Sequence, residues 1–267
     1  MHVTDVRADL LAEQQALDDL VGDITEEQWA LPTPSPRWSV ADQIAHLTYF
    51  DWTATVAITD PDRFQTMVAE LMNSALADDE LAGDDLTLGV YRELSPAELL
   101  ERWRTNRAAL ADASATLADD TRIVWYGPSM GSKSFLTARL MECWAHGQDV
   151  ADALGVERQA TDRLRHIAQL GFITRGWSYV NRGLEPATEP VRVELTAPSC
   201  DVWAFGPDDA AESVTGSAVD FCLVVTQRRH VDDTGLVVAG DAATEWMEKA
   251  QAYAGPPSDG PDAGARG

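Results

Sequence analysis

The chain has 267 residues, 45% of them hydrophobic, and a formal net charge of −24 at pH 7. This length is enough for one large domain or two ordinary ones. A strongly acidic surface repels phosphate groups, which argues against nucleic acid or an anionic membrane as a partner.

The cysteines and the apolar runs indicate a cytoplasmic protein. Cys143, Cys200 and Cys222 are far apart, odd in number and without a CxxC pair, which favours a reducing compartment over a disulfide scaffold. The N-terminal residues lack a basic start followed by an apolar core, so they do not resemble a signal peptide. No apolar run approaches the roughly 18 residues of a membrane span.

The first part of the chain has the pattern of an antiparallel helical bundle. Ser39 and Asp42 have the spacing of a capping box, Ser95 and Pro96 suit a helix start, and Gly155 suits a helix end. Three prolines between residues 31 and 38 must interrupt any helix. Long helices with short breaks are typical of such bundles, and we expect this domain to cover residues 1–158. The expected helical segments are residues 4–29, 39–58, 61–79, 95–113 and 133–155.

After about residue 158 the pattern becomes mixed. We expect a linking helix over residues 161–183, followed by a small α+β domain that ends near residue 255. The tail 256–267, PPSDGPDAGARG, has the composition of a disordered segment. The expected strands are residues 191–198, 200–206, 212–217 and 235–240, and the expected helices are residues 218–230 and 241–255. The fold class is therefore α+β overall, with a helical bundle preceding a smaller mixed domain.

The segment 141–154, MECWAHGQDVADAL, carries ionisable residues on what should be an inward helical face. Relative to Glu142, His146 lies roughly 40° to one side and Asp149 roughly 20° to the other. Buried ionisable groups are costly unless they are paired or bound to a metal. This helix therefore either contains an ion-pair network or contributes to a metal site.

A third candidate ligand lies on the second helix, where His46 sits in an apolar run. A lone histidine in such a run is more often an ordinary core residue. Together with Glu142 and His146 it would give three zinc-compatible ligands on two helices of one bundle. From spacing alone, both interpretations stay open.

Two sequence blocks resemble the mycothiol-dependent maleylpyruvate isomerase family, within the wider DinB-like superfamily. They are WSVADQIAHL at residues 38–47 and TARLMECWAHGQDVADALG at residues 137–155, and LVVTQRRH at 223–230 and the closing helix extend the similarity. The resemblance implies a DinB-like four-helix bundle with a small C-terminal α+β domain. It also implies His46, Glu142 and His146 as ligands of Zn²⁺ or another divalent metal.

The resemblance further implies an enzyme that uses mycothiol or a similar small thiol for cis–trans isomerisation or thiol transfer on a small substrate. Two alternatives stay open: a thiol-independent metal enzyme such as a hydrolase or cyclase, and a non-enzymatic module that binds a metal or ligand. The sequence does not indicate the substrate or the oligomeric state.

Four further residues are candidates for the site. Arg139 either binds a substrate carboxylate or pairs with Glu142 or Asp149. Asp149 either orients a histidine ligand from behind or is a surface acid. The resemblance places an active-site arginine at Arg228 or Arg229, although cations at the C-terminus of a helix are also favourable without any role in a site.

Overall fold

The computed structural model describes residues 2–75, 80–127 and 129–266, without the side chains of residues 72–75 and 80–85. The chain divides into two compact units, Met1–Glu157 and Arg158–Gly267. In the described residues, no helix is both long enough and apolar enough to cross a membrane.

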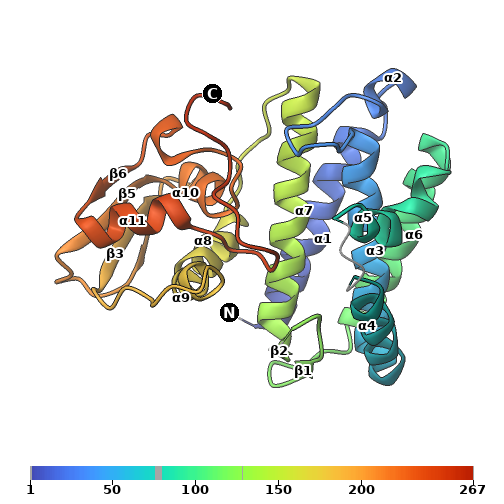
Figure 1. Ribbon diagram of the computed structural model, residues 1–267, viewed down its shortest axis with the longest axis horizontal. Coiled ribbons are helices and arrows are strands. Elements are labelled where there is room, and N and C mark those ends of the chain that lie inside the picture. Colours follow the sequence, from blue (N-terminus) through green and yellow to red (C-terminus); the bar gives the residue numbers. More distant parts are fainter. Residues whose placement is uncertain (1, 76–79, 128, 267) are drawn as a thin grey trace. The chain divides into compact units, whose positions relative to one another are not determined.

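Four long helices form the bundle of the first unit. They are α1 (Val3–Val21), α3 (Val40–Thr59), α6 (Pro96–Ser114) and α7 (Ser132–Leu154). Helix α3 packs against α6 and α7, and α1 packs against the same two helices (Figure 1). Helices α1 and α3 therefore each contact both α6 and α7. The shorter elements are α2 (Glu26–Trp29), α4 (Pro61–Ala75), α5 (Glu80–Arg92) and the two-residue strands β1 (Arg122–Ile123) and β2 (Met130–Gly131).

Local sequence fixes the ends of the helices that matter for the site. The Ser39 side chain accepts a hydrogen bond from the Asp42 backbone N–H, and the Asp42 side chain accepts one from the Ser39 backbone, so the predicted capping box is confirmed. Gly155 ends α7 with a φ of 66°, a left-handed conformation that costs glycine little. These caps set where α3 and α7 begin and end.

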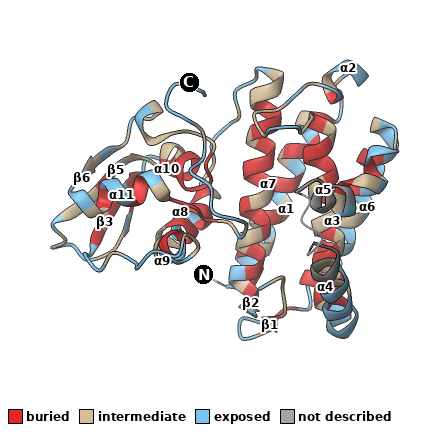
Figure 2. Cartoon of the chain, viewed as in Figure 1, coloured by how far each residue is buried: buried red, intermediate tan, exposed pale blue. Residues whose placement is uncertain are grey.

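The interior of the bundle is mainly apolar, and buried positions recur along α1, α3 and α7 (Figure 2). Leu17, Ile44, Leu47 and Trp103 are among its almost fully buried side chains. Several polar side chains are buried with them, and these include Gln43, Asp51, Arg139 and Asp149. Buried polar groups are costly without partners, so the contacts of these side chains help to locate a functional site in the bundle.

The second unit contains a four-stranded mixed sheet in the order β4-β3-β5-β6. Strand β3 pairs antiparallel with β4 and parallel with β5, and β5 pairs antiparallel with β6. In β3, Val191, Val193 and Leu195 are buried while the residues between them are more exposed, as expected for a sheet with one covered face. The strands are β3 (Val191–Thr196), β4 (Val202–Phe205), β5 (Glu212–Ser217) and β6 (Val237–Ala239), and the helices are α8 (Leu164–Ile173), α9 (Arg175–Val180), α10 (Ala218–Val225) and α11 (Asp241–Lys249).

The α+β fold class is confirmed, whereas several element boundaries differ from the prediction. The helix expected over residues 4–29 is two helices, because Thr25 caps a new one at Glu26. The helix expected over 161–183 is also two, separated at Thr174. Helix α5 was not predicted, since its sequence has neither a clear apolar period nor a start signal. Part of the segment expected over 61–79, residues 76–79, lies outside the described residues.

The tail predicted to be disordered makes hydrogen bonds within the second unit. Gln251 Nε2 donates to the carbonyl of Pro256 at 3.1 Å, and the backbone N–H of Gly264 donates to the Asp233 carboxylate at 2.9 Å. Composition alone could not reveal these contacts, because they depend on acceptors supplied by the folded unit.

Candidate metal centre

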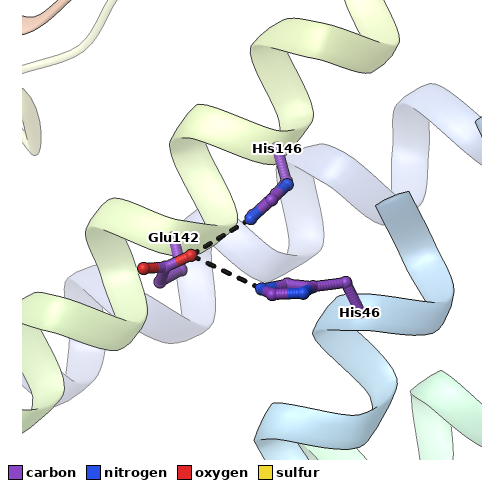
Figure 3. A group of neighbouring side chains, drawn as sticks. All are labelled: His46, Glu142 and His146. Atoms are coloured by element: carbon purple, nitrogen blue, oxygen red, sulfur yellow. Dashed lines mark hydrogen bonds and ion pairs between the residues drawn. The ribbon is translucent and has the colours of Figure 1, made fainter. Parts of the chain in front are cut away.

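Three potential metal ligands converge inside the bundle. His46 lies in the N-terminal half of α3, and Glu142 and His146 lie one turn apart on α7. Because α3 packs directly against α7, the two imidazole rings and the carboxylate point toward one another (Figure 3). All three side chains are largely shielded from solvent.

The spacing of the ligand atoms suits a metal ion. Glu142 Oε2 lies 3.1 Å from His146 Nε2 and 3.6 Å from His46 Nε2. One ligand atom from each residue lies within 4.8 Å of the other two. Tetrahedral zinc bonds of about 2.0–2.2 Å would separate two ligands by roughly 3.3–3.6 Å, so the carboxylate already lies near ligand spacing from each imidazole.

The charge states that the site favours are also those of metal ligands. Burial and, to a smaller extent, the neighbouring His146 lower the pKa of His46 to about 4, against the opposing effect of Glu142. Burial by itself would raise the pKa of Glu142, but hydrogen bonds and charge interactions with His146 and His46 outweigh it and hold that pKa well below its usual range. At neutral pH the site therefore holds a neutral His46 imidazole and an ionised carboxylate, and both can donate lone pairs.

Aromatic rings enclose the two histidines. The Trp38 ring lies 5.1 Å from His46 and 5.8 Å from His146, and the Phe50 ring lies 4.5 Å from His46, measured between centroids. Apolar walls of this kind limit water access and strengthen electrostatic interactions inside a site.

Gln43 contacts a ligand and was not identified as a site residue from the sequence. Its Oε1 lies 2.5 Å from His146 Nδ1, and the side chain is fully buried. Gln43 precedes His46 by three residues on α3, so both lie on the same helical face. That spacing was the only signal in the sequence, and it does not reveal which residue of α7 would be opposite.

Arg139 forms an ion pair that the sequence did not predict. Its Nη2 lies 3.0 Å from Asp51 Oδ1, and both side chains are almost completely buried. The ion pair that the structure gives Arg139 is with Asp51, and a role of this arginine in binding a substrate carboxylate stays a prediction. The counter-ion comes from α3, a neighbouring helix, and periodicity along α7 could not reveal it.

Asp149 is not a surface acid, because its side chain is fully buried. It accepts a hydrogen bond of 3.0 Å from the Ser35 hydroxyl in the loop that leads to α3. Both ring nitrogens of His146 have other partners, Gln43 and Glu142. The contact behind that histidine therefore comes from Gln43. Asp149 holds the Ser35 loop, and a role of Asp149 behind His46 stays a prediction.

Arg228 and Arg229 follow α10 in the second unit. Their guanidinium groups donate to the backbone carbonyls of Thr226 and Arg228, at 2.6 and 2.8 Å. The chain turns at Gln227, where φ is 59°. These contacts match the favourable placement of cations at a helix C-terminus, and a role of either arginine at the metal site stays a prediction.

The fold and the donor set define a class: helical bundles with a buried histidine–glutamate–histidine group, joined to a small α+β unit. Residues 10–151, more than half of the chain, match the family model described as "Mycothiol maleylpyruvate isomerase N-terminal domain". The chain therefore belongs to the mycothiol maleylpyruvate isomerase family. Residues 187–239 match a second model, described as "Wyosine base formation".

Curated relatives extend over nearly the whole chain. The uncharacterized proteins MT0041 and Rv0036c of Mycobacterium tuberculosis, strains CDC 1551 / Oshkosh and ATCC 25618 / H37Rv, are each 48% identical over 253 residues. The alignment covers 95% of this chain and 96% of each relative.

Two solved structures share the fold at low sequence identity. The mycothiol-dependent maleylpyruvate isomerase aligns with a TM-score of 0.57 at 15% identity, and a histidine-to-alanine mutant of it aligns with 0.58 at 16%. Each alignment covers 90% of this chain and 93% of the other.

Proposed function

We propose that this protein is a divalent-metal-dependent enzyme, with Zn²⁺ as the expected metal, that uses a small thiol of the mycothiol type. The reaction would be cis–trans isomerisation of, or thiol transfer to, a small anionic or electrophilic substrate. The observation that carries the proposal is the convergence of His46, Glu142 and His146 at metal-ligand spacing inside a bundle of this family.

His46, Glu142 and His146 would hold the ion through two imidazole nitrogens and one carboxylate oxygen. Three protein ligands are the number found in catalytic zinc sites, which keep a further position for a reactant. A bound divalent metal lowers the pKa of a thiol that coordinates it, so that a thiolate forms near neutral pH.

The thiol would come from outside the chain. Cys143 lies next to Glu142 in sequence, but its side chain belongs to the apolar core cluster of the bundle, with Ile44 and Trp103. Cys200 and Cys222 belong to the second unit. Burial also raises the pKa of Cys222, which keeps that thiol protonated and unreactive.

An electron-poor alkene conjugated to a carbonyl group is the substrate class that suits a thiolate. Addition forms a carbon–sulfur bond and moves the alkene electron pair onto the conjugated carbonyl group. Rotation about the resulting single bond, followed by loss of the thiolate, restores the alkene in the other geometry. Trp38 and Phe50 would restrict water at the site, and Arg228 or Arg229 would bind a carboxylate of the substrate through paired hydrogen bonds.

Metal analysis combined with thiol-dependent turnover tests the proposal. The purified protein should contain about one divalent metal per chain, and conversion of a cis-enone carboxylate such as maleylpyruvate should require added thiol. Full turnover without thiol would support a thiol-independent metal enzyme instead. A metal-free protein that turns over no substrate with or without thiol and added zinc would contradict the proposal altogether.

A further inference from the structure

A polar relay leads from the proline-rich loop to the ring of His146. The Thr33 hydroxyl lies 2.8 Å from the backbone carbonyl of Trp38, Gln43 Nε2 lies 2.8 Å from the Thr33 hydroxyl, and Gln43 Oε1 lies 2.5 Å from His146 Nδ1. Every link is a hydrogen-bond distance, and Gln43 is fully buried, so water cannot substitute for its partners.

The donor and acceptor of each hydrogen bond in this relay follow from the Trp38 carbonyl at its start. A backbone carbonyl can only accept, so the hydrogen of the Thr33 hydroxyl points to Trp38. The same hydroxyl must then accept from Gln43, which fixes Nε2 of the amide on that side and Oε1 on the other. Because Oε1 can only accept, the hydrogen between Gln43 and His146 belongs to Nδ1 of the imidazole.

We propose that Gln43 is a positioning residue for His146. Thr33 orients the Gln43 amide, and Gln43 in turn holds His146 in the Nδ1–H tautomer. In this tautomer the Nε2 lone pair faces Glu142 Oε2 at 3.1 Å. Two lone pairs at that distance repel each other unless a cation lies between them, so the relay prepares Nε2 for a metal ion. The inference deepens the proposed function, and the zinc titration described as its second test rests on that function.

The opposite tautomer is a real competitor in this site. Glu142 Oε2 lies 3.1 Å from His146 Nε2, and a carboxylate is a stronger acceptor than an amide carbonyl, so by itself it would draw the ring proton to Nε2. A proton there would block metal binding until it is released. Gln43 acts against this, because an Nδ1 without hydrogen would place a lone pair 2.5 Å from the amide oxygen.

The loop that anchors the relay is itself firmly held. The backbone N–H of Thr33 also donates to the Trp38 carbonyl, and Val40 N–H donates to the Leu31 carbonyl, which closes the loop over the start of α3. Trp38 also contributes the ring beside both histidines. The loop therefore orients His146 through the hydrogen-bond relay, and the Trp38 ring encloses both His46 and His146.

Nitrogen-15 NMR of the imidazole rings tests the proposal in the metal-free protein at alkaline pH. In the wild type, His146 should show a protonated Nδ1 and an unprotonated Nε2. Gln43→Leu and the nearly isosteric Thr33→Val should shift the ring toward Nε2–H. Thr33→Ser, which keeps the hydroxyl, should restore the wild-type pattern.

Zinc titration gives the second readout. Gln43→Leu should weaken zinc binding by about 10- to 100-fold, the usual loss when a hydrogen bond behind a histidine ligand is removed. Thr33→Val should weaken it less, and Thr33→Ser should not weaken it. The matched control is Gln148→Leu, because Gln148 lies on α7 close to the site but donates to Asp152.

The two readouts separate this inference from the metal proposal. A wild-type His146 with its proton on Nε2, or an unchanged tautomer in both Gln43→Leu and Thr33→Val, would overturn the relay. Because the tautomer is read without metal, a wild type with Nδ1–H that binds no zinc would support the relay and count against the metal function.

Discussion

Asp51 and Arg139 form an ion pair in the interior of the bundle, with 3.0 Å between Oδ1 and Nη2 and side chains that are 3% and 4% exposed. Asp51 also accepts hydrogen bonds from Gln14 Nε2 at 2.9 Å and Trp103 Nε1 at 3.2 Å. One carboxylate on α3 therefore connects α1, α6 and α7. It lies five residues after His46, while Arg139 lies three residues before Glu142, so the pair sets how α3 and α7 meet near the ligands.

Breaking this pair from either side should destabilise the bundle strongly. Asp51→Asn leaves the Arg139 cation buried, and Arg139→Met leaves the Asp51 anion buried, at an expected cost of about 3–5 kcal/mol for each. The double variant removes both charges and keeps an amide for Gln14 and Trp103, so it should lose much less than the sum. Urea unfolding of the four proteins measures this coupling.

Lys133→Met is the matched control for the charge pair, because Lys133 also lies on α7 but pairs with Asp119 at 3.5 Å on the surface. Its effect should stay within about 1 kcal/mol. Additive losses in the double variant of Asp51 and Arg139 would show that the buried pair contributes nothing beyond two separate side chains.

The loss in Arg139→Met should depend on pH. Burial raises the pKa of Asp51, while Arg139 partly counteracts this, so removal of the arginine should raise that pKa further. A carboxyl group whose pKa is higher in the folded than in the unfolded protein lowers stability as the pH rises from the unfolded to the folded value. The cost is complete above the folded value and absent below the unfolded one. The deficit relative to wild type should therefore be largest near neutral pH and shrink as the pH falls toward about 4. A deficit that grows on acidification would contradict this assignment.

Metal binding should stabilise the bundle against heat. Zinc at a 100-fold excess over its Kd should add about 2.7 kcal/mol. For a protein of this size each kcal/mol raises the melting temperature by roughly 2–4 °C. A chelator should remove the gain in the wild type, and His46→Ala, Glu142→Ala and His146→Ala should each show little or none, because two ligands are too few for a stable site.

His2→Ala is the control for this series, since His2 is an exposed histidine of the same unit. It should keep the full zinc-induced shift. Full metal occupancy in His146→Ala would show that the three residues are not the ligands.

Substrate binding through an arginine predicts a loss of turnover without a loss of metal. Arg228→Lys cannot reproduce the two parallel hydrogen bonds of a guanidinium with a carboxylate. We expect a raised KM for an anionic substrate and unchanged zinc content, measured by steady-state kinetics and metal analysis. An effect of Arg229→Lys alone would identify the neighbouring arginine, and no effect of either would remove both from the site.

The sequence predicted the parts of the site that local periodicity controls. Glu142 and His146 lie four residues apart on one helix, so their shared face follows from helical geometry alone. The capping box at Ser39 and the glycine at the end of α7 are likewise local signals. The assignment of His46 needed the family resemblance, because a histidine in an apolar run is usually an ordinary core residue.

Contacts between helices were not predictable in the same way. The partners Asp51 for Arg139 and Gln43 for His146 depend on how α3 rotates against α7, and neither helix encodes that rotation in its own pattern. The interpretation of Asp149 as a surface acid failed for a related reason. Its Ser35 partner lies in a loop whose path over the bundle is set by tertiary contacts.

The proposed chemistry uses an external thiol, and mutation of a cysteine tests whether one of the protein's own thiols reacts instead. Cys143 is the cysteine nearest the ligands in sequence, but it lies about 100° around α7 from Glu142 and is packed into the core. Cys143→Ala, which avoids burying a hydroxyl group, should therefore keep both zinc content and thiol-dependent turnover, at a modest cost in stability. Wild type and variant should show the same dependence of rate on added thiol. A variant that keeps its zinc and its fold, judged by circular dichroism, but loses turnover would make Cys143 the reacting thiol and remove the need for an external one.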